Sequence, residues 1–346
     1  TITGTLIAPR TQIFTGSGAV TLAYGGGSAT EVYPEWWGAI PDGTTDCTSA
    51  VNKAIAAASG GEVVIAAGVY LCDALTLQPQ TSIRGTMKDE SIIKARTAGI
   101  TLLTLSNSVS IAEALLTLSQ FTLDANGGLG AIGFQVNNYA KFTLRDMKFQ
   151  GFTSKGVYSH GSIVWTAYRV DVLNCAIGYD FDTDQSHSNQ IAIRDGSIGG
   201  CATFGVRIDR GALFKLDGVD MEGNGTAGVS TTGTVYLKNM DPDGLGVAAT
   251  IEGLWMENNS GLAAIVIDKP LSNYAKHIIR DLHIFSGTRT SGIHAGGGAT
   301  PYTGLYLENV VAQNAGTQDL LVGTHVIGAR IGCRFSTTNI SADATV

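Results

Sequence analysis

The sequence predicts an all-β solenoid, a chain that winds in successive coils along one axis. The first observation is an internal repeat with steps of 26, 24, 25, 23, 35 and 28 residues, anchored on Leu123, Phe149, Leu173, Ile198, Met221, Met256 and Ile284. The second is that Gly and Asn separate short alternating apolar stretches within each repeat. The third is composition: 45 Gly, only 7 Pro and 44% hydrophobic residues favour turns and strands around a long filled interior. One elongated domain is therefore expected.

The elements before the repeat predict an extension, a helix and two strands. Residues 1–30 read as a small N-terminal β extension, and residues 31–346 as the main solenoid domain. A helix is expected over about 46–58, because Asp46 can cap it and the pattern places one apolar face on Val51, Ala54, Ile55 and Ala58. This helix would cover the exposed core of the end coil. Two buried strands are expected over 62–72, and residues 305–346 still alternate as the last coils.

The segment over 36–86 resembles the entry segment of the pectate-lyase-like right-handed parallel β-helix proteins. Matching residues are Gly38, Ala39, Asp42, Gly43, Asp46, Ala50, Ala54, Gly60, Gly61, Gly68 and Tyr70. It departs from the family pattern at Cys47 and at Ala66 and Ala67. The resemblance implies a right-handed single-stranded parallel β-helix with an N-terminal capping α-helix. It does not imply one chemistry, because the family includes phage tailspikes, capsule depolymerases, polygalacturonase-like enzymes, epimerases and non-catalytic adhesins.

Charge and cysteine content exclude several classes of function. The net charge is −7 and no Lys/Arg cluster exceeds two residues, which argues against nucleic acid and favours a neutral or polyhydroxylated ligand. Five cysteines without CxxC spacing indicate neither a disulfide framework nor a zinc site, and are expected as buried apolar residues. No apolar run is long enough for membrane insertion, and the first residues show no signal-peptide pattern. The six histidines lack metal spacing, and no cofactor motif is present.

A candidate catalytic patch emerges when the residues flanking each anchor are placed on the outer surface. The column before the anchors reads Lys148, Val172, Ser197, Asp220, Trp255 and His283, and the column after them reads Asp124, Gln150, Asn174, Gly199, Glu222, Glu257 and Phe285. Coils about 4.8 Å apart would place the carboxyl groups of Glu222, Glu257 and Asp220 at separations that suit glycoside hydrolysis. Repulsion between these like charges should raise the pKa of one of the carboxyl groups, which suits a general acid. We therefore expect Glu222, Glu257 and Asp220 to be catalytic, and Trp255 and His283 to bind substrate, the indole by stacking on a sugar.

The long step between Met221 and Met256 predicts an inserted loop near 239–249 that carries Asp241 and Asp243 beside this patch, as further substrate-binding residues. The alternative interpretation is structural. Glu222 and Glu257 each precede turn residues and could be solvated strand ends, and Trp255 could pack against a loop.

A second, alternative cluster follows the glycine after each anchor. It comprises Asp182, Asp209, His160, Arg207 and Asp180, in outward columns that also include Ser230 and Thr232. The stretch around Tyr179, Phe181 and Asp182 resembles the active-site stretch of mannuronan epimerases, but the family's catalytic His falls on Asp184, and His187 lies three residues later. Acids alternating with Arg also fit a salt-bridged ladder. Calcium bound by Asp180, Asp182 and Asp209 is the one cofactor considered.

These observations give three hypotheses for function. The first is a polysaccharide depolymerase that hydrolyses glycosidic bonds with a carboxylate pair. The second is a lyase or epimerase acting on uronic acids, which the acidic patch disfavours because it would repel a polyuronate. The third is a non-catalytic glycan-binding tailspike or adhesin. The resemblance to tailspikes further implies a homotrimer and an extracellular or virion-associated location.

Overall fold

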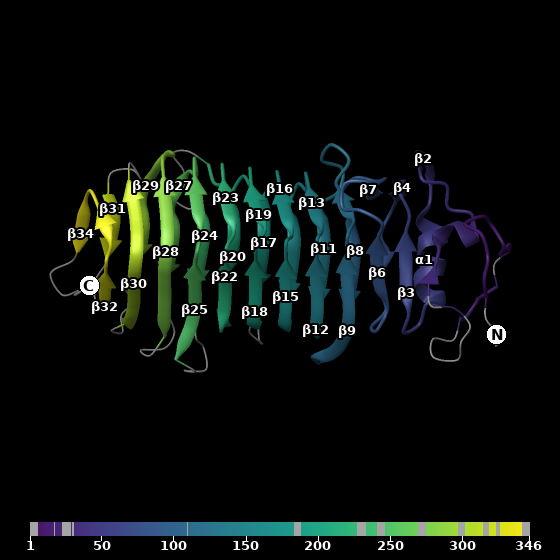
Figure 1. Ribbon diagram of the computed structural model, residues 1–346, viewed down its shortest axis with the longest axis horizontal. Coiled ribbons are helices and arrows are strands. Elements are labelled where there is room, and N and C mark those ends of the chain that lie inside the picture. Colours follow the sequence, from purple (N-terminus) through teal and green to yellow (C-terminus); the bar gives the residue numbers. More distant parts are fainter. Residues whose placement is uncertain are drawn as a thin grey trace. The chain divides into compact units, whose positions relative to one another are not determined.

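The computed structural model consists of two compact units. The N-terminal unit contains residues 1–158 and 167–170, and the C-terminal unit residues 159–166 and 171–346. In both units, successive strands pair in parallel with strands of the next coil, and the predicted parallel β-helix, of the right-handed type, is confirmed (Figure 1). The structure describes residues 6–16, 18–22, 29, 31–108, 110–182, 188–226, 233–240, 246–268, 275–296, 302–313, 318–322 and 326–340.

The N-terminal unit contains the predicted helix and the first coils. A 3-10 helix, η1, spans Pro34–Trp37 and the α-helix α1 spans Thr48–Ala57. The strands are β1 (Glu31–Val32), β2 (Asp42–Asp46), β3 (Glu62–Ile65), β4 (Gly68–Cys72), β5 (Leu75–Thr76), β6 (Ser82–Gly85), β7 (Ser91–Ala95), β8 (Thr101–Ser106), β9 (Ala112–Ser119), β10 (Thr122–Asp124), β11 (Ile132–Asn137), β12 (Tyr139–Arg145) and β13 (Lys148–Gln150). β14 (Lys155–His160) and β15 (Ile163–Tyr168) contain residues of both units.

The helix α1 begins one residue later than an N-cap at Asp46 would imply. Cys47, not Asp46, occupies the N-cap and makes no side-chain cap bond. The Asp46 carboxylate still accepts hydrogen bonds from the backbone N–H and the hydroxyl of Thr48, so it satisfies a free donor of the first turn from one residue further out. The predicted apolar face is buried, which confirms that α1 packs with that side inward.

The described part of residues 1–30 contains no strand beyond an isolated bridge residue at Leu22. This segment instead packs on the helices. The Trp36 indole N–H donates to the Pro9 carbonyl at 3.0 Å, and the Leu22 N–H donates to the Ala57 carbonyl at 3.0 Å. The segment therefore lies against the end of the unit that α1 occupies.

The C-terminal unit continues as coils with two strand-bearing sides. One sheet contains β16 (Asp171–Leu173), β18 (Ser188–Arg194), β19 (Ser197–Gly199), β21 (Gly211–Ala212), β22 (Phe214–Asp217), β23 (Asp220–Glu222), β25 (Val247–Glu252), β26 (Trp255–Glu257), β28 (Lys276–Phe285), β30 (Tyr302–Gln313), β32 (Val326–Ile331) and β33 (Arg334–Phe335). The second contains β17 (Ile177–Asp182), β20 (Phe204–Ile208), β24 (Gly233–Lys238), β27 (Gly261–Asp268), β29 (Arg289–Ala295), β31 (Gln318–Val322) and β34 (Thr338–Ile340).

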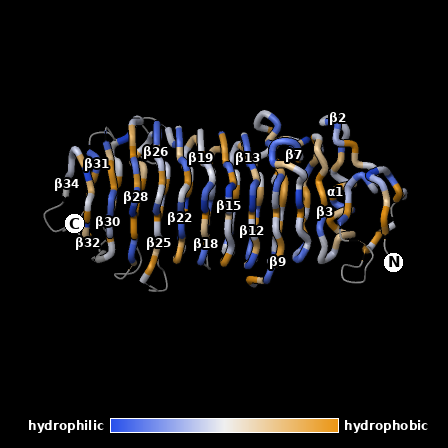
Figure 2. The backbone as a smooth tube through the Cα atoms, in the orientation of Figure 1, coloured by the Kyte–Doolittle hydropathy of each residue, from blue (hydrophilic) through white to orange (hydrophobic). Residues whose placement is uncertain are grey.

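Alternation along the strands separates the core from the surface. Figure 2 shows hydrophobic and hydrophilic residues alternating along strands such as β28. Equivalent inward residues stack over one another from coil to coil and are fully buried, as in the column Val172, Ile198, Met221, Met256, Ile284 and Ala312. This column corrects one anchor: Val172 points inward and Leu173 lies over Gly199, because the two apolar neighbours made the alternation ambiguous at this coil.

Cysteines mostly follow the prediction. All five are free; Cys47, Cys72, Cys175 and Cys201 are buried, whereas Cys333 is half-exposed. The expectation of a buried thiol is therefore wrong for Cys333, which lies in the short segment between β32 and β33.

Candidate functional site

Strands β19, β23, β26 and β28 bring the predicted catalytic residues together. In their parallel register Asp220 lies opposite Trp255, and Glu222 lies opposite Glu257. One coil further on, Trp255 lies opposite His283, and Glu257 lies opposite Phe285. Paired strands are about 4.8 Å apart, so three carboxyl groups from two coils share one outer surface. The predicted patch of Asp220, Glu222, Trp255, Glu257 and His283 is therefore present as a spatial cluster.

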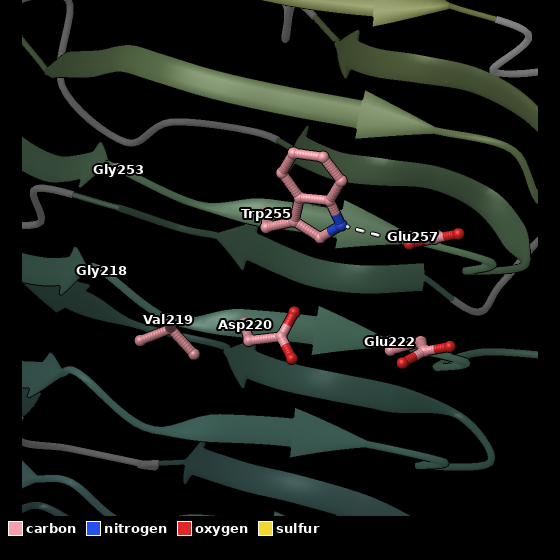
Figure 3. Close-up of a pocket in the computed structure, with 7 residues that line it drawn as sticks. All are labelled: Gly218, Val219, Asp220, Glu222, Gly253, Trp255 and Glu257. Carbon is pink, nitrogen blue, oxygen red and sulfur yellow. Dashed lines mark hydrogen bonds between the residues drawn. The ribbon is translucent and has the colours of Figure 1, made fainter.

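A pocket opens over this cluster because two glycines occupy the turns that precede its strands. Gly218 and Gly253 have φ of 63° and 66°, a left-handed conformation that glycine adopts without steric cost. The equivalent turn positions of the flanking coils carry the side chains of Asp195 and Asp281. An open pocket of about 450 Å³ results, lined by Gly218, Val219, Asp220, Glu222, Gly253, Trp255 and Glu257 (Figure 3).

The carboxyl groups in the pocket are not neutralised by bases. In the described part of the chain, no Lys, Arg or His lies within ion-pair distance of Asp220, Glu222 or Glu257. Partial loss of hydration, followed by repulsion from Glu222 and then Glu257, raises the pKa of Asp220 above its ordinary value, although the residue remains exposed by area. Asp220 is thus the carboxyl group of the three for which the geometry favours keeping a proton.

Acidic side chains just outside the pocket have a different environment. The Lys215 ammonium lies 3.2 Å from the Asp217 carboxylate and 2.5 Å from that of Glu252. The Arg280 guanidinium also contacts Glu252. Lys215 first, and then Arg280, hold the pKa of the Glu252 carboxyl below its ordinary value. The sheet therefore pairs its charges in β22, β25 and β28, whereas no described Lys, Arg or His pairs with the acids in the pocket.

Trp255 connects the acids to an aromatic surface. Its indole N–H donates to Oε2 of Glu257 at 3.2 Å. Figure 3 shows the indole ring face-on over β26, with the N–H directed along the strand toward Glu257. Trp255 is 48% exposed, so about half of its surface is accessible.

A buried asparagine pair supports the turns that follow Glu222 and Glu257, and the sequence interpretation missed it. Asn224 and Asn259 are fully buried. Oδ1 of Asn259 accepts from the backbone N–H and the side-chain amide of Asn224 at 2.9 and 3.0 Å, and the Asn259 amide donates to the Met221 carbonyl at 2.9 Å. The 35-residue separation of the two asparagines equals that of Met221 and Met256, which is the signal that could have revealed this ladder.

The alternative cluster on the second sheet is a salt-bridged ladder. Asp180 lies opposite Arg207, and the guanidinium binds both carboxylate oxygens at 2.7 and 2.8 Å. Asp180 is 1% exposed, so its predicted outward, accessible position is wrong. Asp182 and Asp209 directly follow the last paired residues of β17 and β20.

Asp209 is paired as well: its carboxylate lies 3.2 Å from the Lys238 ammonium and accepts from the Asn239 amide at 3.0 Å. Tyr236, opposite Arg207, occupies the column position expected for Ser230. Ser230 and Thr232 lie outside the described residues, and their predicted register is wrong because part of the long insertion precedes β24. His160 ends β14 and is half-buried.

Three other expectations concern the remaining predicted site residues, the calcium site and membrane insertion. Asp241, Asp243, Asp184 and His187 lie outside the described residues. Within the described ranges, no three His, Cys, Asp or Glu side chains are grouped to hold a metal ion, so calcium binding by Asp180, Asp182 and Asp209 finds no support there. No helix in those ranges is long and apolar enough to span a membrane.

Comparisons with known proteins agree with the resemblance of the entry segment. Residues 36–126 match the family model described as rhamnogalacturonase A/epimerase, pectate lyase-like. The sequence matches no curated protein. Among solved structures, the chain is similar to ORF18 of Geobacillus virus E2, with 12% identity, a TM-score of 0.53, and coverage of 87% of this chain and 60% of that one.

Two further structures share the fold. The gp42 tailspike of Acinetobacter phage vb_AbaP_AS12 has 15% identity and a TM-score of 0.55, with coverage of 86% of this chain and 49% of the tailspike. The surface protein and adhesin PfbA of Streptococcus pneumoniae has 12% identity and a TM-score of 0.52, with coverage of 92% and 99%. The chain thus spans between about half and three fifths of the two viral proteins' lengths. Its first coils carry the pectate lyase-like signature, and the chain has the parallel β-helix fold of that group of proteins.

Proposed function

We propose that the protein hydrolyses glycosidic bonds in a polysaccharide at the pocket formed by β23 and β26. The observation that carries this proposal is the contrast between two carboxyl groups in one open pocket. Asp220 has a raised pKa, which suits a general acid, whereas Glu257 accepts a hydrogen bond from the indole N–H of Trp255, which orients its carboxylate for the role of general base. Two carboxyl groups with opposite protonation states are the requirement of glycoside hydrolysis.

The register bears on the stereochemical course. Asp220 and Glu257 lie on adjacent strands in a diagonal relation, for which the Cα separation is about 7–8 Å. Carboxyl groups that keep the separation of their Cα atoms fall in the range of about 6.5–9.5 Å that leaves room for a water molecule between them, as in inverting enzymes. Glu222 and Glu257 lie directly opposite at about 4.8 Å, near the spacing of retaining enzymes. With Asp220 as the acid and Glu257 as the base, the product is the inverted anomer, and Glu222 serves to keep Asp220 protonated.

The charge of the site favours hydrolysis over a uronate lyase or epimerase. Those reactions need a cation that neutralises the sugar carboxylate, and the residues that line the pocket include three acids but no Lys, Arg or His. The nearby Lys215 and Arg280 are already bound to Asp217 and Glu252. Arg207 of the alternative cluster is bound to Asp180 through both carboxylate oxygens, so it too is engaged. A neutral polysaccharide therefore fits the pocket better than a polyuronate.

A glycan-binding adhesin is the second candidate, favoured by the fold shared with PfbA over almost the whole of that adhesin.

By the same kind of likeness to a phage tailspike, we propose that the chain acts on a cell-surface or extracellular polysaccharide from a virion-associated or extracellular position, as a homotrimer. Sedimentation equilibrium of the protein measures the oligomeric state.

Product analysis on a panel of polysaccharides tests the proposal. Hydrolysis produces new reducing ends; a lyase produces unsaturated ends that absorb in the ultraviolet; an adhesin retains glycan and produces neither. Asp220→Asn and Glu257→Gln should abolish reducing-end formation while the protein stays folded. Full cleavage by both variants would exclude this pocket as the catalytic site.

A further inference from the structure

Three aromatic rings extend the pocket surface toward the C-terminal coils. Trp255 contacts both His283 and Phe285 of β28, with ring centroids 5.8 and 4.8 Å apart, and the two β28 rings are 5.7 Å from each other. The His283 ring plane is only 14° from the indole plane, so these two rings keep nearly one orientation across the two coils, whereas the Phe285 ring is tilted by 40° to the indole. We refer to Trp255, His283 and Phe285 as the aromatic platform.

The platform is one-sided. On the opposite side of the acids, the residues in the same columns are Ser197 and Gly199 of β19, which offer no ring to a sugar. On the platform side, His283 is exposed and Phe285 is half-buried. Neither carries a fixed charge of the kind present in the ladder of Lys215, Glu252 and Arg280.

We propose that His283 and Phe285 form a binding subsite for a neutral pyranose unit, one coil beyond the carboxyl groups on the C-terminal side. This inference rests on the proposed function and adds the direction of the bound chain: the polymer crosses the strands from the acids toward β28. The reason for a pyranose is that its C–H face is apolar while its edge is hydroxylated, and an exposed aromatic face beside polar groups matches both. Continuity with the pocket supports this occupant, because Trp255 lines the pocket and contacts both rings.

Length-dependent binding tests the subsite separately from catalysis. Neutral polysaccharides are screened by affinity electrophoresis with the Asp220→Asn variant, and the retained polymer is cut by partial acid hydrolysis into a ladder of oligosaccharides. Calorimetry then gives the Kd for each length in the Asp220→Asn background, in which binding does not depend on cleavage. Phe285→Leu and His283→Ala are added one at a time. Tyr306→Leu is the matched control, because Tyr306 is an exposed aromatic residue of β30 that belongs neither to the pocket lining nor to the aromatic platform.

Loss of a platform ring should weaken the longer oligosaccharides about three- to tenfold, the effect of losing one aromatic stacking contact, and leave the shortest bound oligosaccharide and the control unchanged. Equal weakening at all lengths, no weakening, or retention of no neutral polymer would overturn the subsite. So would a change in sedimentation without a change in affinity, which would assign the platform to contact with a second copy of the chain. If length dependence holds but wild-type protein cleaves nothing, the subsite stands and the proposed hydrolysis fails.

Discussion

The negative charge of Glu222 should raise the pKa of Asp220, and its removal provides a direct measure of the coupling in the pocket. The two residues are two positions apart on β23, so their Cα atoms are about 6.7 Å apart. At that distance two unit charges repel by about 0.6 kcal/mol in water, and by about 1.2 kcal/mol at half the dielectric constant of water. Since one pKa unit corresponds to about 1.36 kcal/mol, Glu222→Gln should lower the pKa of Asp220 by about 0.5–0.9.

Carbon-detected NMR titration of labelled Asp carboxyl groups measures this pKa without any substrate. The control is Glu308→Gln on β30, which removes the same charge three coils away and three positions earlier along the strand, at roughly 17 Å from Asp220. The downward change should appear at low ionic strength, shrink in added salt, and be absent in the control. In a pH profile of cleavage, the basic limb should move to lower pH by the same amount. An unchanged Asp220 titration in Glu222→Gln would refute the assignment of the raised pKa to this carboxyl cluster.

Three other predictions concern stability. A carboxyl group whose folded-state pKa is raised contributes stability below its unfolded pKa and loses it as the pH rises through the folded value; Asp220→Asn should therefore raise Tm at pH 7 but not at pH 3, as seen by calorimetry. Arg207→Met should lower the free energy of unfolding by up to about 3–5 kcal/mol in urea, because it removes the guanidinium that binds both carboxylate oxygens of the buried Asp180, and adding Asp180→Asn should recover most of the loss. Asn259→Ala should cost about 1–3 kcal/mol for each group it leaves unbonded at Asn224 and Met221, and an undiminished urea midpoint would contradict the ladder.

The outer column of the candidate site could be predicted because the signals there are unambiguous. Met221 stands between the acids Asp220 and Glu222. Met256 is followed by Glu257, and turn residues follow both strands, so alternation and register agree. At β16 two apolar residues, Val172 and Leu173, stand side by side, and alternation alone does not choose between them. The prediction chose Leu173, and the structure selects Val172.

The prediction of the register in the second sheet was wrong for a different physical reason. An insertion can be placed before or after a strand without changing the repeat length, and the sequence interpretation placed all of the surplus after β24. Tyr236, not Ser230, therefore follows Arg207 in the column. The burial of Asp180 could not be predicted from the sequence either, since an acid in an outward column becomes buried only when a neighbouring side chain such as Arg207 covers it.

The pocket itself depends on three-dimensional detail. Gly218 and Gly253 look like ordinary turn glycines in the sequence, and their effect is visible only once the flanking turns are seen to carry Asp195 and Asp281. The hydrogen bond from Trp255 to Glu257, which divides the roles of the acids, likewise depends on side-chain orientation rather than on spacing.

A crystal structure of the Asp220→Asn variant with an oligosaccharide that the wild-type protein cleaves would test the central claim most directly. The account predicts a glycosidic oxygen within hydrogen-bond distance of the side chain at position 220, a water molecule held by Glu257 on the opposite side of the sugar, and a neighbouring ring over Trp255. An oligosaccharide bound instead at Asp182 and Asp209 on the second sheet would contradict it.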